Sequence, residues 1–210
     1  MNKIINLLLL LLVTGCAAVP VKEQFSQLNK KSICCATLKE FKFVPIKLGK
    51  VFPFELSHES PAYLFGKTKS YYKAFSLPDM RDKYVFVKSY FNGGLIRQYL
   101  DPVFFSLDEN HKPLEAFSLN LRFTRGTFLI GDSNARMSGV AKLNPNSKYL
   151  VIFSGGYELE KPVIDLGPST MVTMIGNVPY ATTEPGSTIE LERSPTGSLK
   201  IELKLLQDNK

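Results

Sequence analysis

The sequence of 210 residues has no tryptophan, only two histidines and only three cysteines. The two imidazoles, His58 and His111, are far apart in the sequence, and no cluster of cysteines or carboxylates accompanies either of them. A zinc site needs about four such ligands, so no bound metal or other cofactor is expected.

Arginine-rich stripes and recognition-helix patterns are also missing, so nucleic acid is not an expected partner. The formal net charge is nevertheless +7, and it is unevenly placed, because residues 21 to 74 hold ten lysines and only four glutamates. Such a basic segment can be drawn to anionic headgroups or acidic envelope polymers. It can equally be a solvated, solubilising face, and both interpretations stay open.

The one long apolar run lies at the N-terminus, where Lys3 precedes a leucine-rich stretch over residues 7 to 12. This run is too short to span a bilayer, which takes about 20 apolar residues, and is typical of a secretory signal over residues 1 to 15. Its end, Val13-Thr14-Gly15-Cys16, resembles the signal of bacterial lipoproteins. That resemblance implies cleavage before Cys16, lipidation (palmitate) of this residue, and a membrane anchor.

The residue after Cys16 is alanine rather than aspartate, which in lipoproteins of this type implies sorting to the outer membrane, facing the periplasm. The alternative is an ordinary signal peptide cleaved near Ala17-Ala18, with no lipid attached.

Cys34 and Cys35 are neighbours in the sequence. Adjacent α-carbons lie about 3.8 Å apart, closer than a relaxed disulfide prefers. Three possibilities stay open: buried thiols that act as small apolar groups, a disulfide between the two neighbours, and a bridge to a partner chain.

The rest of the chain predicts an all-β fold: an antiparallel β-sandwich, jelly-roll or immunoglobulin-like, over residues 33 to 206. A flexible lipidated tether over residues 16 to 32 precedes it, and a tail over 207 to 210 follows. Helix should be scarce, because no mature segment keeps a helical period. The expected strands span residues 41–47, 51–56, 71–77, 84–91, 103–107, 115–123, 139–143, 148–154, 170–175, 188–192 and 198–205.

Some of these segments alternate strictly between apolar and polar residues, as in Leu199-Lys200-Ile201-Glu202-Leu203. This alternation predicts a sheet with one face inward and one face in water. The segment Ser194-Pro195-Thr196-Gly197 is expected to be a hairpin turn between the last two strands, and Asn92-Gly93 another turn.

The sequence does not predict an enzyme. Gly131-Asp132-Ser133-Asn134 resembles the block of a lipase and esterase family, but that family carries the block near its N-terminus and a histidine near its C-terminus. Here no histidine follows His111, and an unassisted serine is a poor nucleophile. Asp132 and Asn134 are better explained as loop residues that bond their own backbone.

Aromatic residues give the better binding signal, because sugar rings stack on flat side chains. In adjacent pairs on a strand the two rings point to opposite faces. Candidate ligand-binding aromatics are therefore Tyr71, Tyr72, Tyr90 and Phe91. Packing in a core, or a protein interface, would explain the same residues.

Several short segments follow one another along the chain: Cys34-Cys35, Ser60-Pro61-Ala62-Tyr63-Leu64-Phe65-Gly66, Lys69 to Pro78, Phe104 to Asp108, Lys148 to Phe153 and Ser194 to Leu199. Taken in this order, they resemble the MalM family of maltose operon periplasmic proteins. The resemblance implies a non-catalytic envelope protein that assists carbohydrate uptake, with maltodextrin or another saccharide as a partner. The lipoprotein signal sets this chain apart from the soluble members. A structural or assembly lipoprotein that binds an envelope protein or an anionic polymer is the alternative.

Overall fold

The computed structural model describes residues 18–94, 97–126, 132–155, 161–176 and 178–206. The expected signal peptide, the lipidation site Cys16 and the C-terminal tail lie outside these residues. The structure is mostly β, with 55% strand and one short α-helix among the described residues, so the expected β-rich class is confirmed at this level.

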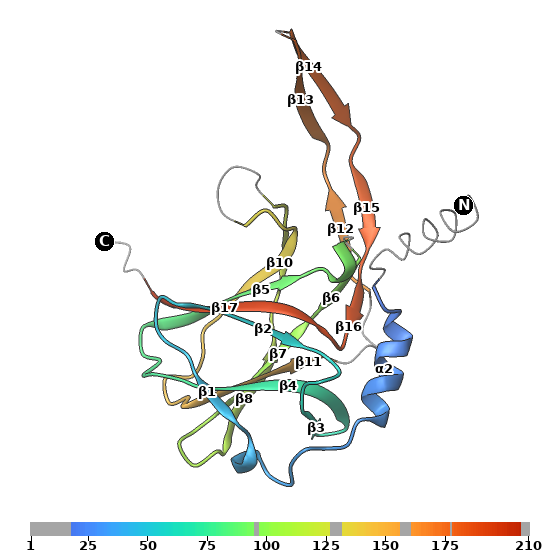
Figure 1. The fold of residues 1–210 in the computed structure, drawn as a ribbon. Coiled ribbons are helices and arrows are strands. Elements are labelled where there is room, and N and C mark those ends of the chain that lie inside the picture. The colour runs from blue at the N-terminus through green and yellow to red at the C-terminus, as the bar shows by residue number, and fades with distance from the viewer. Residues whose placement is uncertain (1–17, 95–96, 127–131, 156–160, 177, 207–210) are drawn as a thin grey trace, which may run out of the picture.

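The larger of the two main sheets has six strands, in the order β1-β4-β11-β7-β8, with β3 paired to β4 (Figure 1). Its strands are β1 (Phe43–Pro45), β3 (Ala62–Phe65), β4 (Thr68–Ser76), β7 (Pro102–Leu107), β8 (Pro113–Ser118) and β11 (Tyr149–Ser154). All pairs are antiparallel except β1 with β4, which is parallel.

The second main sheet has five strands, in the order β2-β17-β5-β10-β9, and all its pairs are antiparallel. Its strands are β2 (Val51–Leu56), β5 (Lys83–Tyr90), β9 (Arg122–Thr124), β10 (Arg136–Ala141) and β17 (Gly197–Leu205).

The two sheets contribute to one main core. Phe75 of β4 and Phe104 of β7 are buried in the same cluster as Val87 of β5 and Ile201 of β17. The expected alternation in β17 is confirmed, since Leu199, Ile201 and Leu203 are all buried. We call these two sheets and their core the body.

The outer face of the six-stranded sheet carries a second, aromatic cluster. Phe41 stacks on Tyr72 with ring centroids 4.1 Å apart, and Phe65 stacks on Phe153 at 3.9 Å. The chain before β1, including the short 3-10 helix η2 (Leu38–Glu40), and the strand β3 supply the covering rings. This sheet therefore has apolar contacts on both faces.

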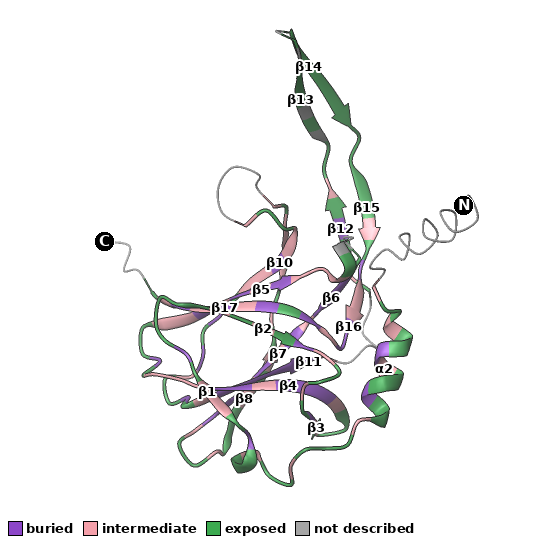
Figure 2. Ribbon diagram, in the orientation of Figure 1, coloured by how far each residue is buried: buried purple, intermediate pink, exposed green. Residues whose placement is uncertain are grey.

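A long two-stranded ribbon, which we call the arm, projects from one end of the body (Figures 1 and 2). It contains β12 (Val163–Leu166) paired with β15 (Ser187–Glu190), and β13 (Ser169–Ile175) paired with β14 (Val178–Glu184). A small third core at its base buries Tyr99, Met137, Ile164 and Leu191.

Helix α2 (Val21–Lys30) lies beside the body, next to β16 (Glu192–Ser194), which pairs in parallel with β6 (Gln98–Leu100). The expectation of a flexible tether over residues 16 to 32 is therefore wrong for the helical part. Leu28 of α2 is fully buried in the main core, which holds the helix in place.

The expected hairpin at Ser194-Gly197 is also wrong, because the strands on its two sides belong to different sheets: β16 pairs with β6, and β17 pairs with β2 and β5. The turn at Asn92-Gly93 is confirmed, and Gly93 has φ +69 in the short helix η3 (Asn92–Gly94). The strands without an expected counterpart are β3, β6, β12, β14 and β16, of which β6 and β16 have only three residues each.

Candidate functional site

A buried polar network attaches α2 to the body. The side-chain nitrogen of Gln24 donates to the Val19 carbonyl at 2.6 Å, and its oxygen accepts from the hydroxyls of Ser194 at 2.5 Å and Thr196 at 2.6 Å. Gln24 is itself buried, so these bonds replace those it would make with water. The network fixes the helix and the direction in which the chain enters the fold.

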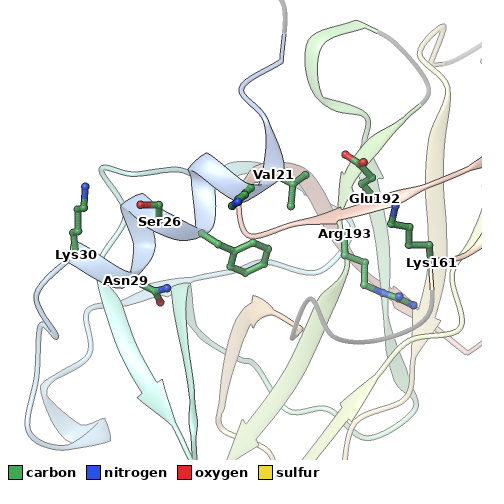
Figure 3. Close-up of a pocket in the computed structure, with 9 residues that line it drawn as sticks. Val21, Ser26, Asn29, Lys30, Lys161, Glu192 and Arg193 are labelled. Carbon is green, nitrogen blue, oxygen red and sulfur yellow. The ribbon is translucent and has the colours of Figure 1, made fainter.

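The docked helix leaves a cavity of about 720 Å³ between itself and β16. Figure 3 shows Asn29 and Lys30 on the helix side and Glu192, Arg193 and Lys161 on the opposite side. Val21 and Phe25 add apolar surface, and Ser26 and Lys22 complete the lining. The cavity thus combines one aromatic ring with hydroxyl, amide, carboxylate and cationic groups.

Two of the cations in the lining are paired. The Lys161 ammonium lies 2.8 Å from Glu190, and the Arg193 guanidinium lies 2.6 Å from Asp101. Burial raises the pKa of Asp101, and Arg193 opposes that rise. Lys22 and Lys30 are exposed, and neither forms an ion pair with the residues that the structure describes.

The sequence did not single out this cavity, although it carried one signal for the helix side. Val21, Phe25 and Leu28 follow the spacing i, i+4, i+7, which is one face of a helix. The residues on the opposite side, Lys161 and Glu192, come from a distant part of the chain that only folding brings to α2.

Tyr71 and Tyr72 point to opposite faces of β4, as expected for neighbours on a strand. Tyr71 is buried in the main core and Tyr72 in the outer aromatic cluster. Burial, aided by Tyr63, raises the pKa of Tyr72 to about 12. Both rings are almost fully buried, and Tyr72 also lines the cavity beside Cys34 and Cys35.

Tyr90 lies half-buried at the end of β5 and takes part in a charged cluster. Its hydroxyl donates to Asp132, whose carboxylate also lies 3.5 Å from the ammonium of Lys88 and 3.4 Å from that of Lys200. Lys200 sits over the Tyr90 ring at 4.9 Å. Burial raises the pKa of Asp132, but Tyr90 and Lys200 outweigh it and lower this pKa to about 2.

The same cluster explains the Asp132-Ser133 motif. Asp132 is engaged by a tyrosine and two lysines, while Ser133 is exposed. The histidines have other neighbours, because His111 stacks on Tyr149 at 4.3 Å and His58 lies 3.0 Å from Glu59. Gly131 lies outside the described residues.

Phe91 packs against Tyr99 and Phe123 at the base of the arm, with ring centroids 6.2 and 6.0 Å apart. It also lines a smaller cavity of about 350 Å³ that includes Ala18 and Gly93. The structure therefore distributes the four candidate aromatics over different surroundings and does not bring them together as one site.

Cys34 and Cys35 are joined by a disulfide, the second of the three possibilities. The Tyr72 hydroxyl lies 3.0 Å from Sγ of Cys34. The pair borders a cavity of about 610 Å³ that is also lined by Glu40, Lys42 and Lys73.

Among the described residues, no group of three or more histidine, cysteine or acidic side chains is placed to hold a metal ion. Nor does any helix in the described part combine the length and apolar character needed to cross a bilayer. No family model, curated protein or solved structure matches this chain. The resemblance to the MalM family thus stays a prediction.

Proposed function

We propose that this protein is a non-catalytic, saccharide-binding lipoprotein that assists carbohydrate uptake. In this proposal Cys16 carries the lipid that holds it to the outer membrane, facing the periplasm. The two facing sheets form a β-sandwich of the jelly-roll or immunoglobulin-like kind, and the resemblance to the MalM family makes maltodextrins the first ligands to test.

The observation that carries this proposal is the cavity between α2 and β16. Its volume of about 720 Å³ falls within the range of small-molecule sites. A sugar ring presents an apolar C–H face and a rim of hydroxyls. Phe25 supplies an apolar surface for the C–H face of the sugar. Asn29, Lys161 and Glu192 supply hydrogen-bond donors and acceptors for its hydroxyls.

Calorimetric titration with maltodextrins tests the proposal. We expect Phe25→Leu, which keeps an apolar side chain for packing on the core, to weaken binding about fivefold, because a stacked ring contributes about 1 kcal/mol beyond its buried area. The matched control is Phe86→Leu, a half-buried ring of β5 beside Lys88 and Lys204 that does not line this cavity. No binding to any glucan at millimolar concentration would remove the saccharide proposal.

A second candidate, binding of an anionic envelope polymer, is favoured by the charge of the lining. Four cationic side chains and one carboxylate face this cavity. Further exposed lysines lie along the chain after α2, at Lys39, Lys42, Lys47 and Lys50. Charge reversal at these four lysines should weaken binding to an acidic polysaccharide, as should salt. A neutral glucan should be affected by neither change, which separates the two candidates.

A further inference from the structure

The arm exposes large apolar side chains at its far end. Val172, Met174, Val178 and Tyr180 are each 61 to 64% exposed, although residues of this kind are normally buried. Figure 2 shows the outer half of the arm as exposed over nearly its whole described length. An exposed apolar surface of this kind marks an interaction site.

The same segment carries no charge. Between Asp165 and Glu184 the sequence is Leu-Gly-Pro-Ser-Thr-Met-Val-Thr-Met-Ile-Gly-Asn-Val-Pro-Tyr-Ala-Thr-Thr, without a lysine, arginine, aspartate or glutamate. Soluble proteins commonly protect exposed strand edges with charged side chains, above all lysine. The absence of such protection over both strands of the ribbon indicates that its outer end is not surrounded by water alone.

Both faces of the ribbon are apolar near the tip. Val172 is paired with Ala181 and Met174 with Pro179, which places these four side chains on one face. Val178 and Tyr180 directly precede and follow Pro179 on β14. Because neighbouring residues on a strand point to opposite faces, these two side chains lie on the other face of the ribbon. A flat protein surface would cover one face only, whereas the interior of a lipid layer surrounds both.

The entry point of the chain places the proposed anchor near the base of the arm. Ala18 packs so closely on Gly93 that a side-chain carbon added there would lie 2.7 Å from the Ala18 Cβ. The neighbouring Phe91 belongs to the small core at the arm's base. Cys16 is two residues before Ala18, and two extended residues span at most about 7 Å. An acylated Cys16 thus brings the lipid surface to the end of the body from which the arm projects.

From these observations we propose that the tip of the arm inserts into the interfacial region of the lipid bilayer. This inference rests on the lipid anchor of the proposed function. Interfacial segments enter about 5 to 10 Å, which in a ribbon is the last two or three residue pairs. That depth immerses Met174 and Val178 and puts Tyr180 at the headgroups, where tyrosine is enriched.

The backbone limits how deep the arm can go. A two-stranded ribbon has two outer edges with unpaired N–H and C=O groups, which the hydrocarbon core cannot satisfy. At the tip this cost is reduced, because Pro179 has no N–H to leave unpaired. Shallow insertion gives the body a second attachment beside the acyl chains and so fixes its orientation on the membrane.

The test uses the full lipidated chain in phosphatidylcholine vesicles, with an environment-sensitive fluorophore on Val178→Cys. The native cysteines do not interfere, because Cys34 and Cys35 are bridged and Cys16 is acylated in this proposal. The matched control carries the label on Val140→Cys of β10, a valine of the body that is 57% exposed. Lipids with a nitroxide near the headgroup should quench the label at 178 and leave the label at 140 unquenched.

Adding Met174→Asp to the labelled chain should lower the inserted fraction about tenfold, because a charge replaces a buried apolar side chain. High salt should leave insertion unchanged, since the tip has no charge to screen.

The mass of the N-terminal peptide shows independently whether Cys16 carries acyl chains. An acylated Cys16 with an unquenched label at 178 would overturn the inference and leave the anchor standing. If Cys16 is unmodified, its free thiol is removed by Cys16→Ser in the labelled chain, and a label at 178 that is still quenched would then support insertion of the arm and remove the anchor. An unquenched label, together with disulfide formation between two copies of the unlabelled Val178→Cys chain, would show that the tip binds a second chain instead, and would also overturn it.

Discussion

The body and the arm use the same extended backbone, but they place their apolar side chains differently. In β17 the inward residues are apolar and Lys200, Glu202 and Lys204 alternate with them. In β14 every residue is exposed, and none but the last, Glu184, is charged. Strand pairing alone therefore does not bury a side chain, and a second layer must cover the sheet.

The boundary between the two regions is the small core around Leu191. Up to Leu166 the arm packs on the body, and Arg125 donates to the Gly167 carbonyl at 2.6 Å. Beyond that point, within the part of the chain that the structure describes, β13 and β14 pair only with each other. An isolated two-stranded ribbon is marginally stable in water, so the outer arm depends on its base or on a partner.

The body and the arm should differ most in how much free energy of unfolding is lost when one apolar side chain is shortened in each. Phe75 is fully buried and touches the rings of Phe52 and Phe54, so Phe75→Ala should lower the free energy of unfolding by about 3 to 5 kcal/mol. Val178→Ala, at an exposed site of the arm, should change it by less than about 0.5 kcal/mol. Urea unfolding measures both, and equal losses would contradict the division into body and arm.

The boundary itself is tested by Leu191→Ala. Leu191 is fully buried where the arm meets the body, so its truncation should lower the free energy of unfolding by about 2 to 3 kcal/mol. Hydrogen exchange should show lost protection in β12 and β15 before β4 and β11. Uniform loss over all strands would mean that arm and body unfold as one unit.

A smaller effect is expected from the charged cluster on the body. The pKa of Asp132 is about 2, below its unfolded value, so its stabilisation is present above about pH 4 and is lost as the pH falls through 2. Asp132→Asn should cost about 1 kcal/mol at neutral pH, because water screens part of the attraction to Lys88 and Lys200.

The difference between wild type and this variant should shrink as the pH is lowered from 4 toward 2, measured by urea unfolding at each pH. Asp165→Asn of β12 is the control, because the Asp165 side chain is exposed and forms no ion pair among the described residues. A pH-independent difference at Asp132 would show that its charge is not what stabilises the fold.

The smallest effect on the stability of the body should come from the turn of the arm. Gly176 has φ +63, which L-residues rarely adopt, and no atom lies close to where a side chain would begin. Gly176→Ala should therefore destabilise only the outer arm, by about 1 kcal/mol, through backbone strain. Hydrogen exchange in β13 and β14 should rise while the urea midpoint of the body stays constant; a shifted midpoint would contradict this.

The sequence predicted strands better where they alternate between apolar and polar residues or carry a clear aromatic pattern. β2 was predicted with its observed bounds, and β7 and β11 to within one residue. Helix α2 was missed, because its apolar face has few residues and its buried Gln24 looks polar in sequence. The hairpin at Ser194-Gly197 was wrong, since a turn motif does not reveal which sheet each flanking strand joins.

The candidate site shows the same limit. The aromatic pairs were correctly expected to face opposite ways, but the sequence could not show that Phe41 and Phe65 cover Tyr72. The sequence also could not show that Phe25 lines the same cavity as Lys161 and Glu192, because these residues are more than a hundred positions away along the chain.

The sequence by itself determined the β-rich character, the inward and outward sides of strands such as β17, and the absence of charge between Asp165 and Glu184, because each depends on local residue types and spacing. Only the tertiary structure decided which strands share a sheet, that α2 docks on the body and borders a cavity, and that the uncharged segment is an uncovered arm. Those features depend on contacts between distant residues, whose energies no local pattern contains.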